Sequence, residues 1–394
     1  MTEIDRHGAR PRVALLRGEA LNPFEMQAYR PLRDDFEILA VGRINGNYET
    51  DQIGIETQFL RSIAQNKHAG RVWQKARSKN LVRHDADHLF GLEELVGGFD
   101  ILHAAETAMP LSEQASKITN SGPPKLVLTC WETIPFRFDD DPALSRRKEL
   151  VRRATSLFIA VTKRAQAALL EEGVAPERVI VVPAAVDCAR FHPDAPSDHL
   201  RQRWNVPPEA TLVLFAGRLI QEKGPTELLR AFSEARSADA YLIFVGNGDQ
   251  GSRLKIAASA LGITEFVRVV PAVTYGEIPA VYASADIVVA PSLPTPYWEE
   301  QFGMVLVEAM ASGSTLISTS SGAISEVVGD GAVLVPPYDH AALTGALRRL
   351  ISNDAERLTQ GNKARQRATS LFDIPVVAPQ ISACYRHVLA DAPS

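Results

Sequence analysis

Short apolar runs rich in β-branched residues alternate with helical patterns along this chain of 394 residues. The alternation is typical of βαβ units, so it predicts an α/β fold with doubly wound parallel sheets. Six runs lie in the first half: RVALLRG (12–18), FEILAVG (36–42), DILHAA (100–105), KLVLTC (125–130), SLFIAVT (156–162) and VIVVPAAVD (179–187). Six lie in the second half: TLVLFAG (211–217), AYLIFVG (240–246), FVRVVPAV (266–273), DIVVAPS (286–292), STLIST (314–319) and AVLVPP (332–337). Each half therefore has enough strands for its own sheet.

The chain length favours two domains, because a single core rarely grows past about 250–300 residues. The boundary is expected within residues 189–210, where proline and charge cluster and the strand pattern stops. A ligand would then bind between the two sheets, outside the carboxyl ends of the strands.

Composition bears on the class of protein. The net charge of −5 gives no overall attraction to nucleic acid. The three cysteines, Cys130, Cys188 and Cys384, lie far apart without a CxxC spacing, which argues against a disulfide framework or a zinc site. The first twelve residues lack the apolar core of a secretory signal, and no apolar run reaches the length of a membrane span. We therefore expect a cytoplasmic protein that at most contacts the inner face of the membrane.

The stretch FAGRLIQEKGPTELLRAF (215–232) joins a predicted strand to a predicted helix. Its loop carries Arg218 and Lys223, and Pro225 suits the first position of the helix. Two cations beside a helix N-terminus can bind a phosphate or diphosphate. Taken alone, an arginine and lysine pair of this kind favours a solvated loop.

The stretch PTPYWEEQFGMVLVEAMASG (294–313) follows another predicted strand. Gly303 suits a close backbone approach, and Gly313 suits the end of a short helix. The backbone amides of Gly303, Met304 and Val305 would then be free to bind phosphate.

Two carboxylates accompany this turn. Glu300 precedes it, and Glu308 lies four residues after Met304, so that its side chain leans back toward the helix N-terminus. Carboxylates accept hydrogen bonds from hydroxyl groups such as those of a sugar or a ribose. A nucleotide sugar offers both the diphosphate and the hydroxyls.

The order of these motifs resembles the GT4 family of retaining glycosyltransferases. The resemblance rests on GRLxxxKG, then E-x7-E around FGMV, then SGAISEVVGDGAVLVPP (321–337). The segments 156–187 and 275–292 also resemble landmarks of that family, and the N-terminal part matches it loosely.

The resemblance implies the GT-B fold, with two Rossmann-like domains facing each other across a cleft. Residues 1–190 would form the acceptor domain and residues 191–373 the nucleotide-sugar domain. The C-terminal helix, residues 374–394, would pack back on the first domain.

The resemblance also implies roles for single residues. Arg218 and Lys223 would bind the donor diphosphate, Glu308 the ribose and Glu300 the transferred sugar. The donor would be a UDP- or GDP-linked sugar, with no metal and no cofactor, since cations and amides can stabilise the leaving diphosphate.

The base of the nucleotide would lie near Val270 and Pro271, mostly against backbone.

Two other functions stay open: a nucleotide-sugar 2-epimerase and a non-catalytic sugar-nucleotide binder. A Rossmann oxidoreductase is set aside, because LLRGEALNP follows the first predicted strand in place of GxGxxG.

The first half departs from the family after the strand KLVLTC. Trp131 stands where many GT4 members have a histidine, and it is expected to form a wall for a sugar or to pack in the cleft. His103 and Glu106, at the neighbouring strand end, are expected to face the same pocket.

Glu132 has two competing roles. It could orient a hydroxyl or an amine of the acceptor, in which case Glu132→Gln would lower transfer strongly and leave donor binding nearly intact. Otherwise it holds its loop through an ion pair with Arg137.

The loop RGEALNPFEMQAYRPL (17–32) has only Gly18 where family members often have paired glycines. Glu19 and Asn22 are candidates for contact with the acceptor, which could be a small molecule, a glycan or a lipid-linked molecule. A purely structural loop is the alternative.

Two further segments lie between the second and third predicted strands. HDADH (84–88) resembles a metal-binding motif, but it follows a basic stretch, so we interpret it as a surface turn. Residues 57–84 carry seven cations and no acid, and their apolar residues recur at roughly helical spacing, which predicts a basic amphipathic helix: Phe59, Leu60, Ile63, Val72 and Trp73. That helix would either cover the core or contact an anionic acceptor or a membrane surface.

Overall fold

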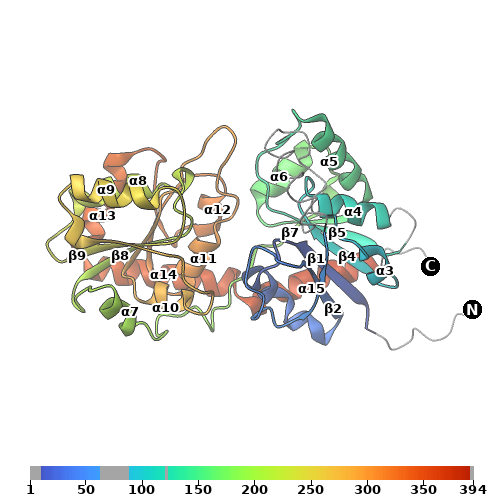
Figure 1. The fold of residues 1–394 in the computed structure, drawn as a ribbon, viewed down its shortest axis with the longest axis horizontal. Coiled ribbons are helices and arrows are strands. Elements are labelled where there is room, and N and C mark those ends of the chain that lie inside the picture. Colours follow the sequence, from blue (N-terminus) through green and yellow to red (C-terminus); the bar gives the residue numbers. More distant parts are fainter. Residues whose placement is uncertain (1–9, 63–87, 120–122, 391–394) are drawn as a thin grey trace, which may run out of the picture. The chain divides into compact units, whose positions relative to one another are not determined.

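In a computed structural model, which describes residues 10–62, 88–119 and 123–390, the chain divides into two compact units (Figure 1). One unit comprises Met1–Pro183 with Val377–Ser394, and the other comprises Ala184–Val376. Each unit contains one parallel sheet, which confirms the predicted α/β architecture. The segment 189–210, with helix α7 (Asp198–Arg203), belongs to the second unit.

The sheet of the first unit has the strand order β3-β2-β1-β4-β5-β6-β7, and all its neighbouring pairs are parallel. Its strands are β1 (Arg12–Gly18), β2 (Glu37–Arg43), β3 (Glu56–Leu60), β4 (Ile101–Ala105), β5 (Lys125–Cys130), β6 (Thr155–Ala160) and β7 (Val179–Val181). The order reverses between β1 and β4, as in doubly wound sheets.

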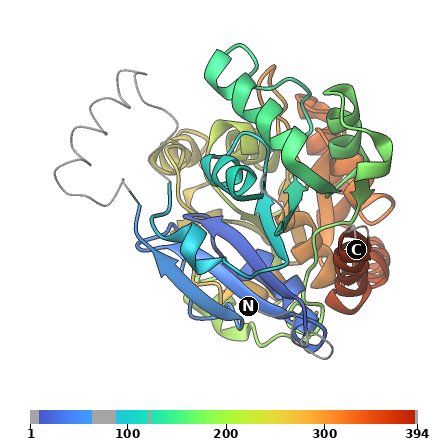
Figure 2. The same cartoon turned by 90° about the vertical axis from the view of Figure 1, so that its right-hand side faces the viewer.

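Helices cover both faces of this sheet (Figures 1 and 2). The first unit contains α1 (Pro23–Met26), α3 (Leu92–Leu95), α4 (Pro110–Thr119), α5 (Pro142–Ala154), α6 (Lys163–Glu171) and most of α15 (Ile374–Ala390). Leu102 and Leu128 face the core shared with α3 to α6. His103 of β4 faces the other way and contacts Tyr385 of α15, as expected from the alternation of side chains along a strand.

The second sheet repeats the topology with the order β10-β9-β8-β11-β12-β13, again with parallel neighbours. Its strands are β8 (Thr211–Ala216), β9 (Ala240–Val245), β10 (Val267–Val270), β11 (Ile287–Ala290), β12 (Thr315–Thr319) and β13 (Val333–Val335). The order reverses between β8 and β11.

The helices of the second unit again form two layers (Figure 1). They are α7, α8 (Pro225–Ala235), α9 (Gly251–Ala260), α10 (Ile278–Ala283), α11 (Met304–Ala311), α12 (Ile324–Val328), α13 (His340–Ile351) and α14 (Asp354–Leu371). Phe215, Phe244 and Ile317 of the sheet share a core with α8, α9 and α13. α11 and α14 pack together, and both contact β12. Among the described helices, none is both long and apolar enough to span a membrane.

Helix α15 is fastened to the first unit by polar contacts as well as packing. The Tyr385 hydroxyl lies 2.6 Å from Nδ1 of His103, and the Tyr385 ring packs edge-on against Phe36 at 5.3 Å. Asp35 accepts hydrogen bonds from Ser382 at 3.2 Å and from Arg386 at 2.6 Å. These contacts hold the last helix on the face of the sheet that β4 presents.

We expect Tyr385→Phe to lower the free energy of unfolding of the first unit by about 1–2 kcal/mol, because it leaves a buried imidazole nitrogen without its partner. Chemical denaturation followed by circular dichroism would measure this. Tyr48→Phe, at a half-exposed side chain of the same unit, is the control and should change stability little. Equal stability of both variants would show that the hydroxyl of Tyr385 contributes nothing.

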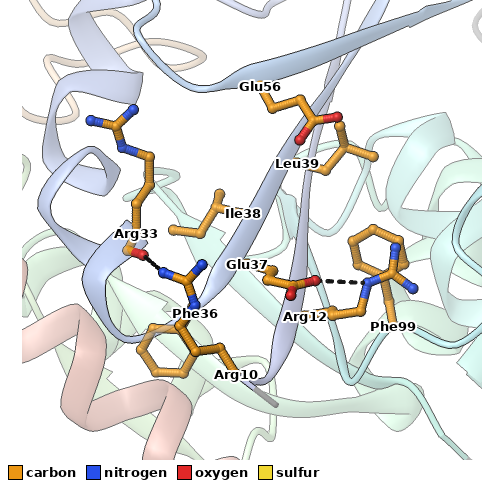
Figure 3. A pocket seen from close by; sticks show the side chains of 9 residues that line it. All are labelled: Arg10, Arg12, Arg33, Phe36, Glu37, Ile38, Leu39, Glu56 and Phe99. Atoms are coloured by element: carbon orange, nitrogen blue, oxygen red, sulfur yellow. Dashed lines mark hydrogen bonds and ion pairs between the residues drawn. The ribbon is translucent and has the colours of Figure 1, made fainter.

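A cavity of about 410 Å³ lies at the amino ends of β1 and β2, the edge of the first sheet opposite to the loops that follow these strands (Figure 3). Phe36 and Ile38 form its buried floor, and Arg12 stacks on Phe99 at 4.1 Å and pairs with Glu37 at 3.4 Å.

The sequence predictions between the second and third expected strands have mixed outcomes. The helix that was expected to begin near Thr57 is wrong for its first residues, because Glu56–Leu60 form strand β3 along the edge of β2. Residues 63–84 of the basic segment, and all of HDADH except His88, lie outside the described residues.

Candidate functional site

The polar residues predicted in the second half meet where the strand order of the second sheet reverses. β8 and β11 are paired neighbours, but the chain leads from β8 to β9 on one side of this pair and from β11 to β12 on the other side. Their carboxyl ends lead into the loops 217–224 and 291–303. A crevice at such a reversal is where doubly wound sheets bind ligands.

Lys223 and Glu300 join these two loops. Nζ of Lys223 lies 2.5 Å from Oε2 of Glu300, and Oγ of Ser292 donates to the same oxygen at 2.9 Å. Nζ of Lys223 also lies 5.0 Å from the centre of the Trp298 ring. The family resemblance assigned Lys223 to a diphosphate and Glu300 to a sugar, and in the structure the two side chains bind each other.

Two helices begin beside this ion pair. α8 starts after Gly224 and α11 after Gly303, and among the described residues no side chain caps either terminus. Pro225 occupies the first position of α8, as predicted, and Gly313 follows α11 with a φ of +71°. The first-turn amides of a helix have no partner within the helix, and they give its N-terminus a partial positive charge. In α11 these amides include those of Met304 and Val305.

Gly224 allows the two loops to approach closely. Its φ is +68°, and a Cβ there would lie 2.2 Å from the carbonyl oxygen of Pro291. The amide of Leu293 donates to the carbonyl of Glu222 at 2.8 Å, which completes the contact. A side chain at position 224 would therefore push apart the loops that Lys223 and Glu300 join.

Glu308 lies in the middle of α11 and is buried. The hydroxyl of Tyr282, which is also buried, donates to Oε2 of Glu308 at 3.1 Å. Burial raises the pKa of Glu308 to about 7, while the Tyr282 hydrogen bond and the charge of Arg190 act in the opposite direction. The carboxyl thus changes charge near neutral pH.

The other donor residues predicted from the sequence lie at the ends of their strands. Arg218 follows β8 and is exposed, and its guanidinium makes no ion pair with the described residues. Val270 ends β10 and accepts a backbone hydrogen bond from Gly246 at 3.1 Å, and Pro271 after it is exposed. Arg218 is therefore a cation available to a ligand.

In the first unit, Glu106 organises the loop after β5. Its Oε1 accepts hydrogen bonds from the amides of Trp131 at 2.7 Å and Glu132 at 3.2 Å. Its own backbone adopts a φ of +64°, which is uncommon for a residue other than glycine. Burial raises its pKa to about 7, with a further contribution from the charge of Glu132, against the two amides and Arg137.

Glu132 binds its own loop. One oxygen accepts from the amides of Thr133 and Ile134, at 3.0 and 2.9 Å, and the other lies 2.6 Å from Nη1 of Arg137. This is the ion pair that was one of its two expected roles. Trp131 next to it is partly buried.

His103 does not face a pocket, contrary to the sequence prediction. Its side chain is fully buried, and its two ring nitrogens lie 2.6 and 2.7 Å from the hydroxyls of Tyr385 and Thr129. Burial, with the nearby charge of Arg17, holds the pKa of His103 well below its ordinary value. It is therefore a neutral residue of the core.

Glu19 and Asn22 also have partners within the first unit. Glu19 forms an ion pair with Arg43 at 2.7 Å. Asn22 caps α1, since its Oδ1 accepts from the amide of Glu25 at 2.7 Å, and its side-chain amide donates to the carbonyl of Ala20 at 2.7 Å. The geometry accordingly supports the structural role of this loop.

Sequence reasoning missed Ser292 and Tyr282, the two hydroxyls that contact the glutamates. Both lie within the landmark segment 275–292, so the pattern marked their neighbourhood but not their partners. In the described part of the chain, no cluster of three or more His, Cys, Asp or Glu side chains could hold a metal ion.

Two family models match the chain. The model described as "Glycosyl transferases group 1" matches residues 196–367, and the model described as "Glycosyltransferase Family 4" matches residues 59–190. The first match contains the loops that Lys223 and Glu300 join.

Several proteins have similar sequences. A D-inositol 3-phosphate glycosyltransferase of Salinispora arenicola is 35% identical over 212 residues, which are 49% of this chain and 46% of that protein. An MMP alpha-(1->4)-mannosyltransferase of Mycolicibacterium hassiacum is 32% identical over 248 residues, which are 62% of this chain and 57% of that protein. The chain thus spans about half the length of these relatives.

Solved structures resemble the chain over nearly its whole length. Anabaena Alr3699/HepE in complex with UDP has a TM-score of 0.76 at 20% identity, and the match covers 96% of this chain and 100% of that one. Sucrose-phosphate synthase of Thermosynechococcus elongatus has a TM-score of 0.72 at 18% identity, covering 97% and 100%. At these identities the likeness shows the fold.

Proposed function

Because the chain belongs to the GT4 family of glycosyltransferases and has their GT-B fold, we propose that it transfers a sugar from a nucleotide diphosphate to an acceptor with retention of configuration. The observation that carries this proposal is the meeting of Lys223 and Glu300 between the starts of α8 and α11. A cation, a carboxylate and two uncapped helix termini suit a ligand that has both a diphosphate and hydroxyl groups.

We place the diphosphate at the two loops after β8 and β11. Lys223 and the exposed Arg218 would approach its oxygens, and the first-turn amides of α11 would donate to it. Lys223 must then exchange Glu300 for phosphate. Glu300, released from Lys223, would accept a hydrogen bond from a hydroxyl of the transferred sugar. Glu308 would accept hydrogen bonds from the ribose hydroxyls.

The reaction breaks the bond between the anomeric carbon and the diphosphate oxygen. Negative charge develops on that oxygen, and the fixed cations and amides stabilise it. We propose that these groups stabilise the leaving diphosphate without a metal ion. The acceptor hydroxyl attacks from the side of the leaving group, and the departing oxygen takes its proton, so no separate strong base is required.

We assign the acceptor to the first unit, where Trp131 would provide an apolar wall beside the loop that Glu106 organises. Relatives act on D-inositol 3-phosphate and on MMP, according to their names. We propose a hydroxyl-bearing acceptor of that general kind, and we assign Glu132 to holding the loop, given its ion pair with Arg137.

A thermal-shift panel of UDP-, GDP-, ADP- and dTDP-sugars tests the donor. A ligand that binds the folded state at 100 times its Kd stabilises it by about 2.7 kcal/mol, which is a clear rise in melting temperature. Mass spectrometry of the stabilising donor with and without acceptor then separates the outcomes. Hydrolysis or a sugar adduct supports transfer, whereas an isomerised donor, binding without turnover, or no shift at all would contradict it.

A further inference from the structure

We propose that Ser292 and Tyr282 are positioning residues, each of which holds one of the two site glutamates through a buried hydroxyl. Ser292 holds Glu300 and Tyr282 holds Glu308. The inference rests on the proposed function, because it assigns the two hydroxyls to separate steps. Ser292 serves the transferred sugar, and Tyr282 serves binding of the nucleotide.

Ser292 and Lys223 share one oxygen of Glu300, at 2.9 and 2.5 Å. A diphosphate that binds Lys223 takes away the ionic partner of this carboxylate. The Ser292 hydroxyl remains, because it points into the interior and its side chain is almost fully buried. Its own main chain is held by the hydroxyl of Thr319, which donates to the Ser292 carbonyl.

The backbone of Glu300 is fixed independently of its side chain. Its carbonyl accepts a hydrogen bond from the amide of Ala323 at 2.9 Å. A Cβ at Gly322 would lie 2.2 Å from the same carbonyl oxygen, so the two segments are in close contact. With the backbone held, the remaining freedom of Glu300 is rotation about its side-chain bonds, and the hydrogen bond from Ser292 restrains that motion.

Tyr282 positions Glu308 in the same way, but for binding of the nucleotide. Its hydroxyl donates to Oε2 at 3.1 Å, and its carbonyl accepts from Oγ of Ser314 at 3.2 Å. The hydrogen bond favours the charged carboxylate, which is the better acceptor for ribose hydroxyls. Oε1 accepts no hydrogen bond from the described residues and is the oxygen left for a ligand.

These assignments predict that removing each hydroxyl changes a different constant, kcat for Ser292 and the Kd for Tyr282. We expect Ser292→Ala to lower kcat about 10- to 100-fold and to leave the Kd of the nucleoside diphosphate within about twofold, since a hydrogen bond to a charged group is lost at the sugar only. We expect Tyr282→Phe to raise the Kd of the nucleoside diphosphate by a similar factor, with a smaller change in kcat at saturating donor.

Matched controls separate positioning from simple loss of a buried hydroxyl. Ser318 is a buried serine on the neighbouring strand, and its Oγ donates to the carbonyl of Ala290 at 2.6 Å. Tyr385 is a buried tyrosine with a hydrogen-bonded hydroxyl in the first unit. Ser318→Ala and Tyr385→Phe should lower the melting temperature as much as the test variants do, yet leave kcat and the Kd unchanged.

The experiment measures UDP and GDP binding by calorimetry and donor turnover by mass spectrometry, for the wild type and four variants. The pH profile of the Kd provides a second readout, since Tyr282→Phe should move its midpoint to higher pH, whereas Ser292→Ala should not. The proposal is supported if Ser292→Ala lowers mainly kcat while Tyr282→Phe raises mainly the Kd. Equal effects of Ser292→Ala and Ser318→Ala, or loss of both kcat and binding in both test variants, would overturn it while the transferase assignment stands. A wild type that neither binds nor turns over any donor would refute the proposed function itself, and the inference with it.

Discussion

Replacing Lys223 with alanine will lower kcat by about 10²–10³-fold, the range found when one group that stabilises a developing oxyanion is removed. Two effects combine. The leaving diphosphate loses a cation, and Glu300 keeps its negative charge beside the place where the phosphate binds. The Kd of the nucleoside diphosphate should therefore rise as well, and at low salt more than at high salt. Calorimetry and initial-rate measurements at two ionic strengths would show this.

A double-mutant cycle separates the two effects. If like-charge repulsion by Glu300 contributes, the variant Lys223→Ala with Glu300→Gln should bind the nucleoside diphosphate more tightly than Lys223→Ala alone, although its kcat stays low. Lys255→Ala, at an exposed lysine of α9 in the same unit, is the control for general loss of charge. If Lys223→Ala retains kcat within about threefold of the Lys255 control, the diphosphate is not at this ion pair.

Most strands of the fold could be predicted because they are buried on both faces. In VLF (213–215) or IVV (287–289) every residue is apolar, which leaves parallel strands as the simplest interpretation. β3 escaped detection because ETQFL pairs with β2 alone and is largely exposed, so its sequence carries neither a buried run nor a clean alternation. Edge strands of this kind are specified by their neighbour more than by their own pattern.

The site could be predicted as a set of residues but not as a set of contacts. The motifs placed Arg218, Lys223 and Glu300 in loops that follow strands and Glu308 within the next helix, where the structure has them. The pairing of Lys223 with Glu300 joins loops that are 77 residues apart in sequence, and no spacing rule encodes it. His103 shows the opposite error, because a polar residue near a strand end looked functional while its position on β4 turned it toward α15.

Replacing Glu308 with glutamine should weaken nucleotide binding and, at alkaline pH, stabilise the second unit. The folded-state pKa of Glu308 is about 7, above the ordinary value of 4.5. Between these values the folded state binds more protons than the unfolded state, so stability falls as pH rises through this window and is lowest above pH 7. For a shift of this size the loss between pH 5 and pH 8 is about 2–3 kcal/mol.

Urea denaturation at pH 5 and pH 8 would measure that loss, and Glu308→Gln should remove it, because the amide has no charge to bury. Glu265→Gln, at an exposed glutamate of the same unit, should keep the pH dependence of the wild type. Glu106 contributes a loss of the same sign in the first unit, but that contribution is the same in the wild type and in Glu308→Gln, so the difference between them reports Glu308. If Glu308→Gln kept both the pH dependence and the nucleotide affinity of the wild type, the carboxylate would have no part in binding. A variant that gains stability while it loses affinity would instead show that the buried charge at Glu308 is kept at a cost to the fold because the ligand requires it.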